Sequence, residues 1–561
     1  MHFNFIFKIL MTVKPSTKYF KNENNQYECK ICHRTFDVQN SAIRHSHDHP
    51  DIPKKNLSKF TYNDNNILLS TERLLLWKAS HGIAMEALED PLIINLLPDN
   101  SLMSRKTNQN IIDQMSSQII ELNYEQTSSK KISLILDGGT LLHQKWLAIG
   151  FLYRTDFGIK FNILDVQLFD KATSEAIKQK IQLISERINH HGGEVVGVCT
   201  DNASNFCKAF LDSEDDSDFV PLGIVRVSCA CHTVQLCLKD LYDEDSFYRN
   251  FVELIKIIPT KISYLKREQI KLLGIASFPP HQSQRWNSVF ITLQYIIRNI
   301  AAVSSLFTLN ELAYLQLIDL FNLAYLLLPV HIFTTTCEAD NATQSTVYVA
   351  YRGLKESLKL NRSKRARLLL DIIKKRFKST ADISISKLCY FTTNAGLCEK
   401  QERYPHVSSS SVKTKNDENA IKFDKEIKFI VSFRSTIQKI CNILSLDFEC
   451  VFAGFKILME NASPENNDIH KYPGPIELRD LFLKITGDDR SYIQLSNFLD
   501  VIQILPASEA SAERIFARMR DIYNKKQTQL SVKSLRSNLI LSFHAQKIRT
   551  MDCEIENSDS D

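Results

Sequence analysis

Apolar runs in the first half of the chain predict a β-rich region between residues 130 and 206. The segments 130–140, 144–154 and 159–169 are rich in β-branched and aromatic residues, and short polar or glycine-containing turns separate them. Such a pattern is typical of an antiparallel meander. Residues 194–200 form a nearly continuous apolar run, as expected for a buried strand, and a helix start follows at about residue 202.

A helix is predicted between the third and the fourth of these strands. Over about 174–190 the apolar positions recur every three or four residues, at Ile177, Ile181, Ile184 and Ile188. Three strands, a helix and a fourth strand is the order in which RNase H-like folds begin. In this order Asp137 closes the first strand and Asp201 closes the fourth.

The two aspartates are candidates for a metal-dependent catalytic site. If the first and fourth strands lie side by side, carboxylates at their ends can meet and hold divalent ions a few ångströms apart. Phosphoryl transfer needs that arrangement, because the ions activate the attacking hydroxyl and offset the charge of the phosphate. Each residue also has a structural interpretation: Asp137 precedes Gly138 and Gly139 and suits a turn, and Asp201 suits a helix N-cap.

The rest of the chain follows mainly helical patterns. Residues 57–128 and 306–497 repeat apolar positions at helical spacing. Within the second region, the basic segment 361–378 is either a solvated amphipathic helix, a contact to the DNA backbone or a split nuclear-import signal. Residues 404–424 are rich in serine and lysine and favour a mobile loop, and the acidic tail 549–561 is predicted to be disordered.

Composition indicates a folded, intracellular protein of several modules. The chain of 561 residues is too long for one hydrophobic core, and 44% hydrophobic and 24% charged residues are ordinary values. A net charge of +5 permits a nucleic-acid partner without demanding one. Thirteen cysteines without a regular framework favour a reducing compartment. No run of about 18 apolar residues without charge is present, so no membrane role is expected.

The N-terminal segment has the ligand spacing of a zinc finger. Cys29 and Cys32 are two residues apart, and His45 and His49 are one helical turn apart on a predicted helix. Two such pairs suit the tetrahedral coordination of Zn²⁺, whose binding would drive the folding of so short a domain. His47 is an alternative fourth ligand. Arg34 and Arg44 are the candidate DNA contacts of this helix region.

Two further motifs follow the aspartates. Cys229, Cys231 and His232 lie together after a predicted fifth strand; because no second ligand pair is near, structural support of the site by Cys229 and His232 is favoured over zinc binding. Arg285 and Trp286 form the second motif. A lone tryptophan is more often a core residue, but an aromatic side chain beside extruded DNA can stack on a base.

In this order the motifs resemble those of the hAT superfamily of DNA transposases, and the finger resembles the BED type. Near the end of the chain, Arg514 and Phe516 match the Glu-Arg-x-Phe core of the hAT C-terminal motif, which favours Glu513 as the third carboxylate. Glu509, one helical turn earlier, is the rival. Both could instead pair with nearby arginines. The family has Ser where this chain has Ala512 and Ala517, and Trp where it has Tyr19.

The resemblance covers nearly the whole chain and implies an α/β (α+β) fold. An RNase H-like catalytic core would be interrupted by a large all-α insertion. The implied domains are the finger with an N-terminal extension (1–56), a helical DNA-binding or dimerisation domain (57–128), the first part of the core (129–305), the insertion (306–497), the C-terminal core helix with the dimerisation region (498–548) and the acidic tail (549–561).

An active member of that family binds transposon ends, cuts DNA, forms hairpins on the flanking DNA and joins the excised 3′ ends to target DNA. The resemblance therefore implies that Asp137, Asp201 and Glu513 hold two Mg²⁺ or Mn²⁺ ions and that Arg285 and Trp286 contact DNA. It also implies a nuclear protein that is at least a dimer, with Leu535, Leu539, Leu541 and Phe543 helping to bury the interface. A domesticated, non-catalytic transcriptional regulator is the main alternative, and an intracellular nuclease is a third.

Overall fold

The structure is a computed structural model of the whole chain, and it separates into two compact units, residues 1–69 and 70–561. The described residues are 105–141, 143–155, 158–169, 171–210, 223–263, 287–301, 317–379, 383–403, 425–461, 475–486, 490–524 and 531–558, together with 74–76, 78–79 and the backbone of three short strands.

The described part of the first unit is a small antiparallel sheet. Its strands are β1 (Tyr19–Lys21), β2 (Tyr27–Cys29) and β3 (Thr35–Phe36), in the order β1-β2-β3. Tyr19 pairs with Cys29, and Tyr27 pairs with Phe36. Cys29, the first predicted zinc ligand, thus ends the central strand. Cys32, His45, His47 and His49 lie outside the described residues, as do Arg34 and Arg44.

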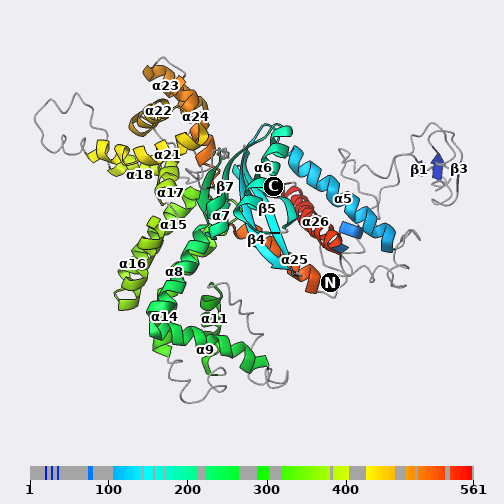
Figure 1. Cartoon of the computed structure of the whole chain (residues 1–561), viewed down its shortest axis with the longest axis horizontal. Helices are drawn as coiled ribbons and strands as arrows, with labels where there is room; N and C mark the ends of the chain where they lie inside the picture. The colour runs from blue at the N-terminus through cyan, green and yellow to red at the C-terminus, as the bar shows by residue number, and fades with distance from the viewer. Residues whose placement is uncertain are drawn as a thin grey trace, which may run out of the picture. The chain divides into compact units, whose positions relative to one another are not determined.

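The second unit contains a five-stranded mixed sheet (Figure 1). The strands are β4 (Lys131–Leu141), β5 (Gln144–Thr155), β6 (Gly158–Phe169), β7 (Glu194–Thr200) and β8 (Val225–Ser228), in the order β6-β5-β4-β7-β8. The first three strands form an antiparallel meander, as predicted. β7 pairs in parallel with β4, and β8 in parallel with β7. The predicted adjacency of the first and fourth strands is therefore confirmed.

Helix α6 (Ser174–His190) connects β6 to β7 and matches the predicted range. Its N-cap is Thr173, whose hydroxyl accepts a hydrogen bond from the backbone N–H of Ala176 at 3.2 Å. The isoleucine stripe predicted from the sequence is fully buried. In β7, six consecutive residues are buried, because the strand is covered on both faces. Apolar periodicity thus predicted these elements correctly.

Asp137 does not close its strand, contrary to the prediction. β4 continues to Leu141 because its pairing with β5 continues: Asp137 lies opposite Ala148, and Gly139 lies opposite Trp146. The glycines are therefore extended rather than in a turn. The pairing with β7 ends at Ile135, so Asp137 lies where β4 projects beyond its parallel neighbour.

Helices form most of the remainder of the second unit. They are α5 (Arg105–Glu125), α7 (Ser204–Ala209), α8 (Ala230–Glu244), α9 (Ser246–Ser263), α11 (Asn287–Arg298), α14 (Leu317–Cys337), α15 (Gln344–Leu360), α16 (Lys364–Ser379), α17 (Ile383–Phe391), α18 (Asn394–Arg403), α21 (Arg434–Leu444), α22 (Phe448–Asn461), α23 (Pro475–Thr486), α24 (Arg490–Ile502), α25 (Ala510–Asn524) and α26 (Val532–Ser558). One hydrophobic cluster extends from β7 through many of these helices to Ala507. The α+β class is confirmed.

Helix α14 is the most apolar of the helices in the described part of the chain. Among the described residues, its segment Ile318–Cys337 is the one helix that is long and apolar enough to cross a membrane. It packs against α8, α11 and α15, and Leu323, Leu327 and Phe333 are buried there. One face of α14 is therefore packed in the hydrophobic core.

The basic helix α16 packs on α8 through buried Leu369, Ile373 and Phe377. Arg376 donates two hydrogen bonds to Asp240 of α8, at 2.6 and 2.7 Å. Arg365 contacts both carboxylate oxygens of Asp245 at 3.1 Å. Two of the arginines that the sequence assigned to a solvated or DNA-binding face therefore join helices within the chain.

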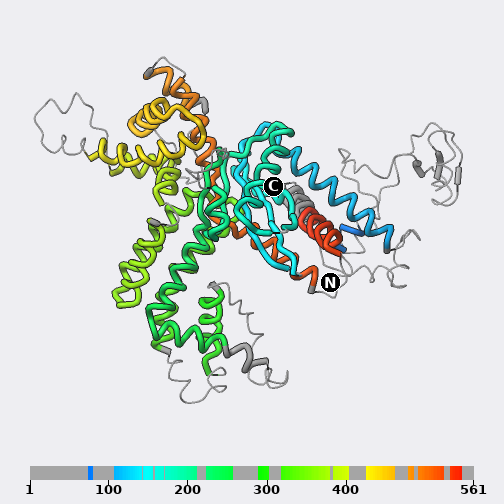
Figure 2. Tube along the Cα trace, viewed as in Figure 1, coloured from blue at the N-terminus to red at the C-terminus, as the bar shows by residue number. Residues whose placement is uncertain are grey.

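The C-terminal helix α26 lies beside α5, although more than 400 residues separate them in the sequence (Figure 2). Leu535, Leu539 and Leu541 are fully buried within the same chain. They are not available to bury a dimer interface, which corrects the expectation for these residues; Phe543 is half-buried. The helix continues to Ser558, and the disorder of the tail from residue 549 stays a prediction.

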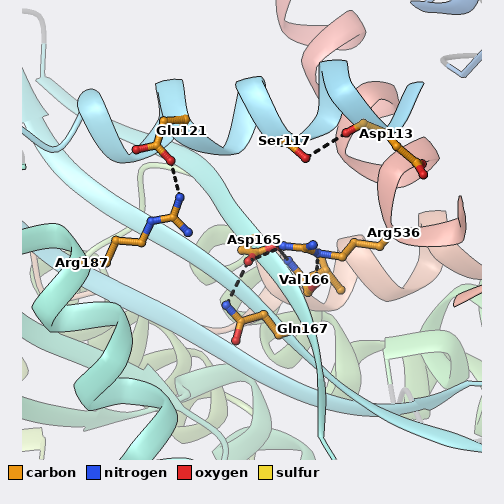
Figure 3. Close-up of polar contacts among 8 residues, drawn as sticks. All are labelled: Asp113, Ser117, Glu121, Asp165, Val166, Gln167, Arg187 and Arg536. Atoms are coloured by element: carbon orange, nitrogen blue, oxygen red, sulfur yellow. Dashed lines mark hydrogen bonds and ion pairs between the residues drawn. The ribbon is translucent and has the colours of Figure 1, made fainter. Parts of the chain in front are cut away.

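A buried ion pair fixes α26 to the sheet (Figure 3). Asp165 of β6 is 1% exposed, and Arg536 of α26 donates to both of its carboxylate oxygens, at 2.6 and 2.8 Å. The backbone N–H of Val166 and the side-chain amide of Gln167 also donate to Asp165, at 2.7 and 2.9 Å. Both oxygens of this buried carboxylate are therefore hydrogen-bonded.

Candidate acidic site

Asp137 and Asp201 occupy matching places on the two central parallel strands. Ile135 of β4 pairs with Cys199 of β7, and each aspartate lies two residues beyond its member of that pair. Side chains two residues apart on a strand point to the same face. If the pairing of β4 with β7 is continued by two residues, the two aspartates lie opposite one another, at the end of the sheet where this parallel pairing stops.

The backbone around Asp201 is fixed by a turn and by an arginine. Oδ1 of Asp201 accepts a hydrogen bond from the N–H of Ala203 at 3.0 Å. The N-cap of α7 is Ala203 itself, so Asp201 is a turn residue and not the N-cap. Arg226 of β8 donates to the backbone oxygen of Asp201 at 2.7 Å and to the hydroxyl of Thr200 at 3.0 Å. The motif analysis missed Arg226, although a charged residue between the apolar positions of a short strand is a visible signal.

A third acidic residue reaches this edge from the far end of the chain. The segment 505–509 forms an isolated bridge through Pro506 to Thr343, and it is held by backbone hydrogen bonds from Gln344 to Leu505 (2.9 Å), from Ala507 to Ala342 (3.0 Å) and from Ala230 to Ala507 (3.0 Å). These bonds attach it to the α14–α15 connection and to the start of α8. They determine where Glu509, the next acidic residue, lies.

Glu509 is 4% exposed and immediately precedes α25. Burial raises the pKa of its carboxyl well above the usual range, and the negative charges of the nearby carboxylates Asp137, Asp201 and Glu513 raise it further. Its Oε2 atom has no hydrogen-bond partner. Glu509 is therefore the residue at which the acidic groups of the site interact most strongly.

Cys229 links Glu509 to helix α8. Its sulfur accepts a hydrogen bond from the N–H of Glu509 at 3.5 Å and one from the N–H of His232 at 3.3 Å, as the N-cap of α8. Burial raises the pKa of the Cys229 thiol well above its usual range, which keeps it neutral. Cys229 thus supports the backbone of the acidic site, and His232 contributes its backbone N–H.

Glu513 lies in the first turn of α25 and is half-buried. Its N–H donates to the backbone oxygen of Glu509 at 3.0 Å, which forms the first bond of the helix. Its neighbour Arg514 pairs with Asp340 and donates to the backbone oxygen of Glu338 at 3.0 Å. The ring of Phe516 packs on β4, where a Cβ on Gly139 would lie 2.9 Å from it. Arg514 and Phe516, the two residues that match the family motif, thus position α25 on the sheet.

The donor set is suited to hard divalent cations, since all its acidic side chains offer carboxylate oxygens. Within the described ranges, however, no three His, Cys, Asp or Glu side chains lie close enough to one point to hold a metal ion. This applies to Cys229, Cys231 and His232 as well as to the four carboxylates. The sequence thus identified the acidic residues of this region. Their described side chains, however, are not arranged as the coordination shell of a metal ion.

The second predicted DNA-contact motif, Arg285 and Trp286, lies outside the described residues. Helix α11 begins directly after it, at Asn287. The roles of these two residues stay predictions.

No protein-family model matches the chain, and no curated protein matches it. Among solved structures, it is similar to the Drosophila P element transposase strand transfer complex, with 11% sequence identity and a TM-score of 0.31. The match covers 90% of this chain and 98% of that chain. At this identity and this TM-score, the similarity defines neither the fold nor the function.

Proposed function

We propose that this chain is a DNA transposase of the hAT type with an RNase H-like core. It would bind the terminal repeats of a transposon and catalyse metal-dependent strand cleavage, hairpin formation and strand transfer. Asp137, Asp201 and Glu513 are its proposed catalytic residues. The motif order supports the family, and the strand order β6-β5-β4-β7-β8 supports the core.

One observation carries the catalytic part of the proposal. The segment 505–513 arrives at the same edge of the sheet as Asp137 and Asp201, although it is more than 300 residues away in sequence. Folding spends free energy to place like charges together, because it removes them from water and makes them repel. A buried carboxyl with a strongly raised pKa, such as that of Glu509, is typical of a functional site.

The carboxylates would hold two Mg²⁺ or Mn²⁺ ions, which supply activation of a nucleophilic hydroxyl and stabilisation of the leaving oxygen. Asp137 lies on β4, Asp201 directly follows β7, and Glu513 lies in the first turn of α25. Arg226 holds the Asp201 backbone, and Phe516 holds α25 against β4.

The remaining parts of the proposal concern the ends of the chain. Cys29, Cys32, His45 and His49 would bind one Zn²⁺ and fold a BED-type finger that contacts DNA through Arg34 and Arg44, and Arg285 and Trp286 would contact DNA beside the cut. The protein would act in the nucleus as a dimer or larger homo-oligomer. A domesticated regulator would keep the finger and DNA binding but not cleavage.

The test is cleavage of DNA that carries the inverted repeats flanking the coding sequence, with Mg²⁺ or Mn²⁺. We expect Asp201→Asn to lower the cleavage rate by at least about a hundredfold, since it removes a proposed metal ligand. Asp243→Asn, an exposed aspartate on α8, is the matched control and should cut at the wild-type rate. Specific binding of this DNA without any cutting by the wild-type protein would refute the transposase and leave the regulator.

A further inference from the structure

The basic segment 361–378 carries a charge that the proposed chemistry does not use. It contains eight basic residues and one acidic residue, a net charge of +7, whereas the whole chain carries +5. Three of the eight basic residues pair with carboxylates of the same chain, namely Arg365, Arg376 and Lys374. The excess positive charge of the protein therefore lies in this segment, and internal ion pairs account for less than half of its cations.

The exposed side of α16 presents four of these residues in one line, which we call the basic row: Lys364, Arg367, Lys374 and Lys378. All four are exposed, and they follow one another at intervals of three, seven and four residues, so they share one face of the helix. At a rise of about 1.5 Å per residue, the basic row is about 21 Å long. The opposite face of α16 is buried against α8, which holds the basic row in place.

This arrangement of charges does not stabilise the helix by itself. The first turn of α16 contains no acidic residue, although the helix dipole favours acids there. Lys364 and Arg367 are like charges three residues apart, and Lys374 and Lys378 are like charges four residues apart, so each pair repels. A solvated helix face usually mixes both signs, whereas the basic row is interrupted by Asp371 alone. An anionic partner would replace this repulsion by attraction.

Duplex DNA is the anionic partner that fits a rigid row of cations. Its strands carry about one phosphate charge per 1.7 Å of helix axis, so a row of about 21 Å runs past about twelve charges. An acidic membrane fits less well, because an amphipathic helix binds a membrane through its apolar face. That face of α16 is already occupied, since Leu369, Ile373 and Phe377 are buried within the chain.

We propose that the basic row of α16 binds the phosphate backbone of duplex DNA without regard to its sequence. The inference rests on the proposed function only for the choice of DNA as the partner, and it does not depend on the acidic site. It assigns a DNA contact to the helical part of the chain between β8 and α25, where the motifs predict no contact beyond Arg285 and Trp286. Contacts to phosphates fix the position of a duplex, while contacts to bases read its sequence.

The test is the affinity of the full-length protein for a DNA duplex that lacks the terminal repeats, measured by fluorescence anisotropy at a series of NaCl concentrations. We expect the double variant Lys364→Gln with Lys378→Gln to bind at least about tenfold more weakly at 0.1 M salt, and the slope of log affinity against log salt to become shallower by about two, one for each lost phosphate contact. Its melting midpoint should stay close to that of the wild type, because lysine and glutamine have similar helix propensities.

The matched control is Lys456→Gln with Lys484→Gln, which removes two exposed lysines from α22 and α23. It makes the same change of net charge and should leave the salt slope unchanged. If the double variant of α16 and this control weaken binding equally, the effect is one of net charge and the proposal is overturned. A wild-type salt slope in the double variant of α16 would also overturn it and leave α16 as a solvated helix.

Asp371→Asn tests the same surface in the opposite direction. It removes the acid that interrupts the basic row and releases Lys374 from its ion pair, so we expect DNA binding to become about two- to threefold tighter. Unchanged or weaker binding would count against the proposal. Asp201→Asn should keep the wild-type salt slope, because the acidic site takes no part. A wild-type protein that binds no DNA of any sequence would refute the proposed function as well, whereas DNA binding that ignores the basic row refutes this inference alone.

Discussion

Two buried carboxylates on the same sheet have opposite surroundings. Asp165 of β6 is paired with Arg536 and accepts two further hydrogen bonds, so both of its oxygens are satisfied (Figure 3). Glu509 is nearly as buried, but it lies among acids and keeps one oxygen without a partner. The first arrangement stabilises the contact between α26 and the sheet. The second destabilises the fold, because a buried carboxyl oxygen without a hydrogen-bond partner has lost its contacts with water.

The largest loss of stability is expected when Asp165, like Glu509, has no cationic partner. Arg536→Met leaves Asp165 buried and without its cation, and should lower the free energy of unfolding by about 2–3 kcal/mol. This expected loss is smaller than the loss usually seen when a buried ion pair is broken, because the Arg536 side chain is 37% exposed and water partly screens its charge. Urea denaturation followed by circular dichroism measures the change.

The double variant Asp165→Leu with Arg536→Met is the control for that experiment. It removes the charge together with its partner and should recover most of the lost stability. A loss below about 0.5 kcal/mol in Arg536→Met would show that the pair is no more important than an exposed one, and the contrast with Glu509 would disappear.

A smaller effect is expected where α25 rests on the sheet. A methyl group on Gly139 would lie 2.9 Å from the Phe516 ring, whereas one on Gly138 would lie 3.6 Å from Phe206. Gly139→Ala should therefore cost about 1 kcal/mol more than Gly138→Ala, since the ring must move. Thermal unfolding of the two variants measures the difference. Equal stabilities would mean that Phe516 does not set the position of α25.

The smallest effect is on the pH dependence of stability. The pKa of Glu509 is raised in the folded state, mainly by burial, then by the negative charges of Asp137, Asp201 and Glu513. The folded protein therefore holds a proton that the unfolded chain has released, so this contribution to stability is full below the ordinary glutamate pKa and is lost as pH rises through the raised value. Without divalent cations, wild-type stability should fall with pH in this window.

Glu509→Gln should flatten that profile, and Glu513→Gln serves as its control. The readout is the urea midpoint at a series of pH values in a chelator-containing buffer. A profile of Glu509→Gln that runs parallel to the wild type would show that Glu509 keeps an ordinary pKa.

Much of the sheet could be predicted from the sequence, because strand and helix periods are local properties. The helix over 174–190, the meander and the adjacency of β4 and β7 are confirmed. The placement of Asp137 at the end of its strand was wrong, since Gly138 and Gly139 favour a turn in isolation but are extended by pairing with β5. The zinc ligands and the Arg285-Trp286 motif stay predictions.

The candidate site was predicted in part. The sequence identified Asp137, Asp201 and Glu513, with Glu509 as the rival of Glu513. The choice of Glu513 rested on the match of Arg514 and Phe516 to the family motif, because residues four apart on a helix share a face. Arg226 and the contact of Cys229 with Glu509 were not predicted. Leu535, Leu539 and Leu541 were predicted to help bury an interface between chains, but they are buried within this chain, because α26 packs against α5, α25 and β6.

By itself the sequence determined which segments become strands and helices and which acids are available, since both follow from side-chain chemistry and from spacing along a short stretch of chain. Only the tertiary structure decided that Glu509 is buried and Glu513 half-buried. That difference comes from hydrogen bonds to Ala230, Ala342 and Gln344, which lie more than 160 residues away in sequence. No local pattern records such contacts, because they form only when the hydrophobic core brings these segments together.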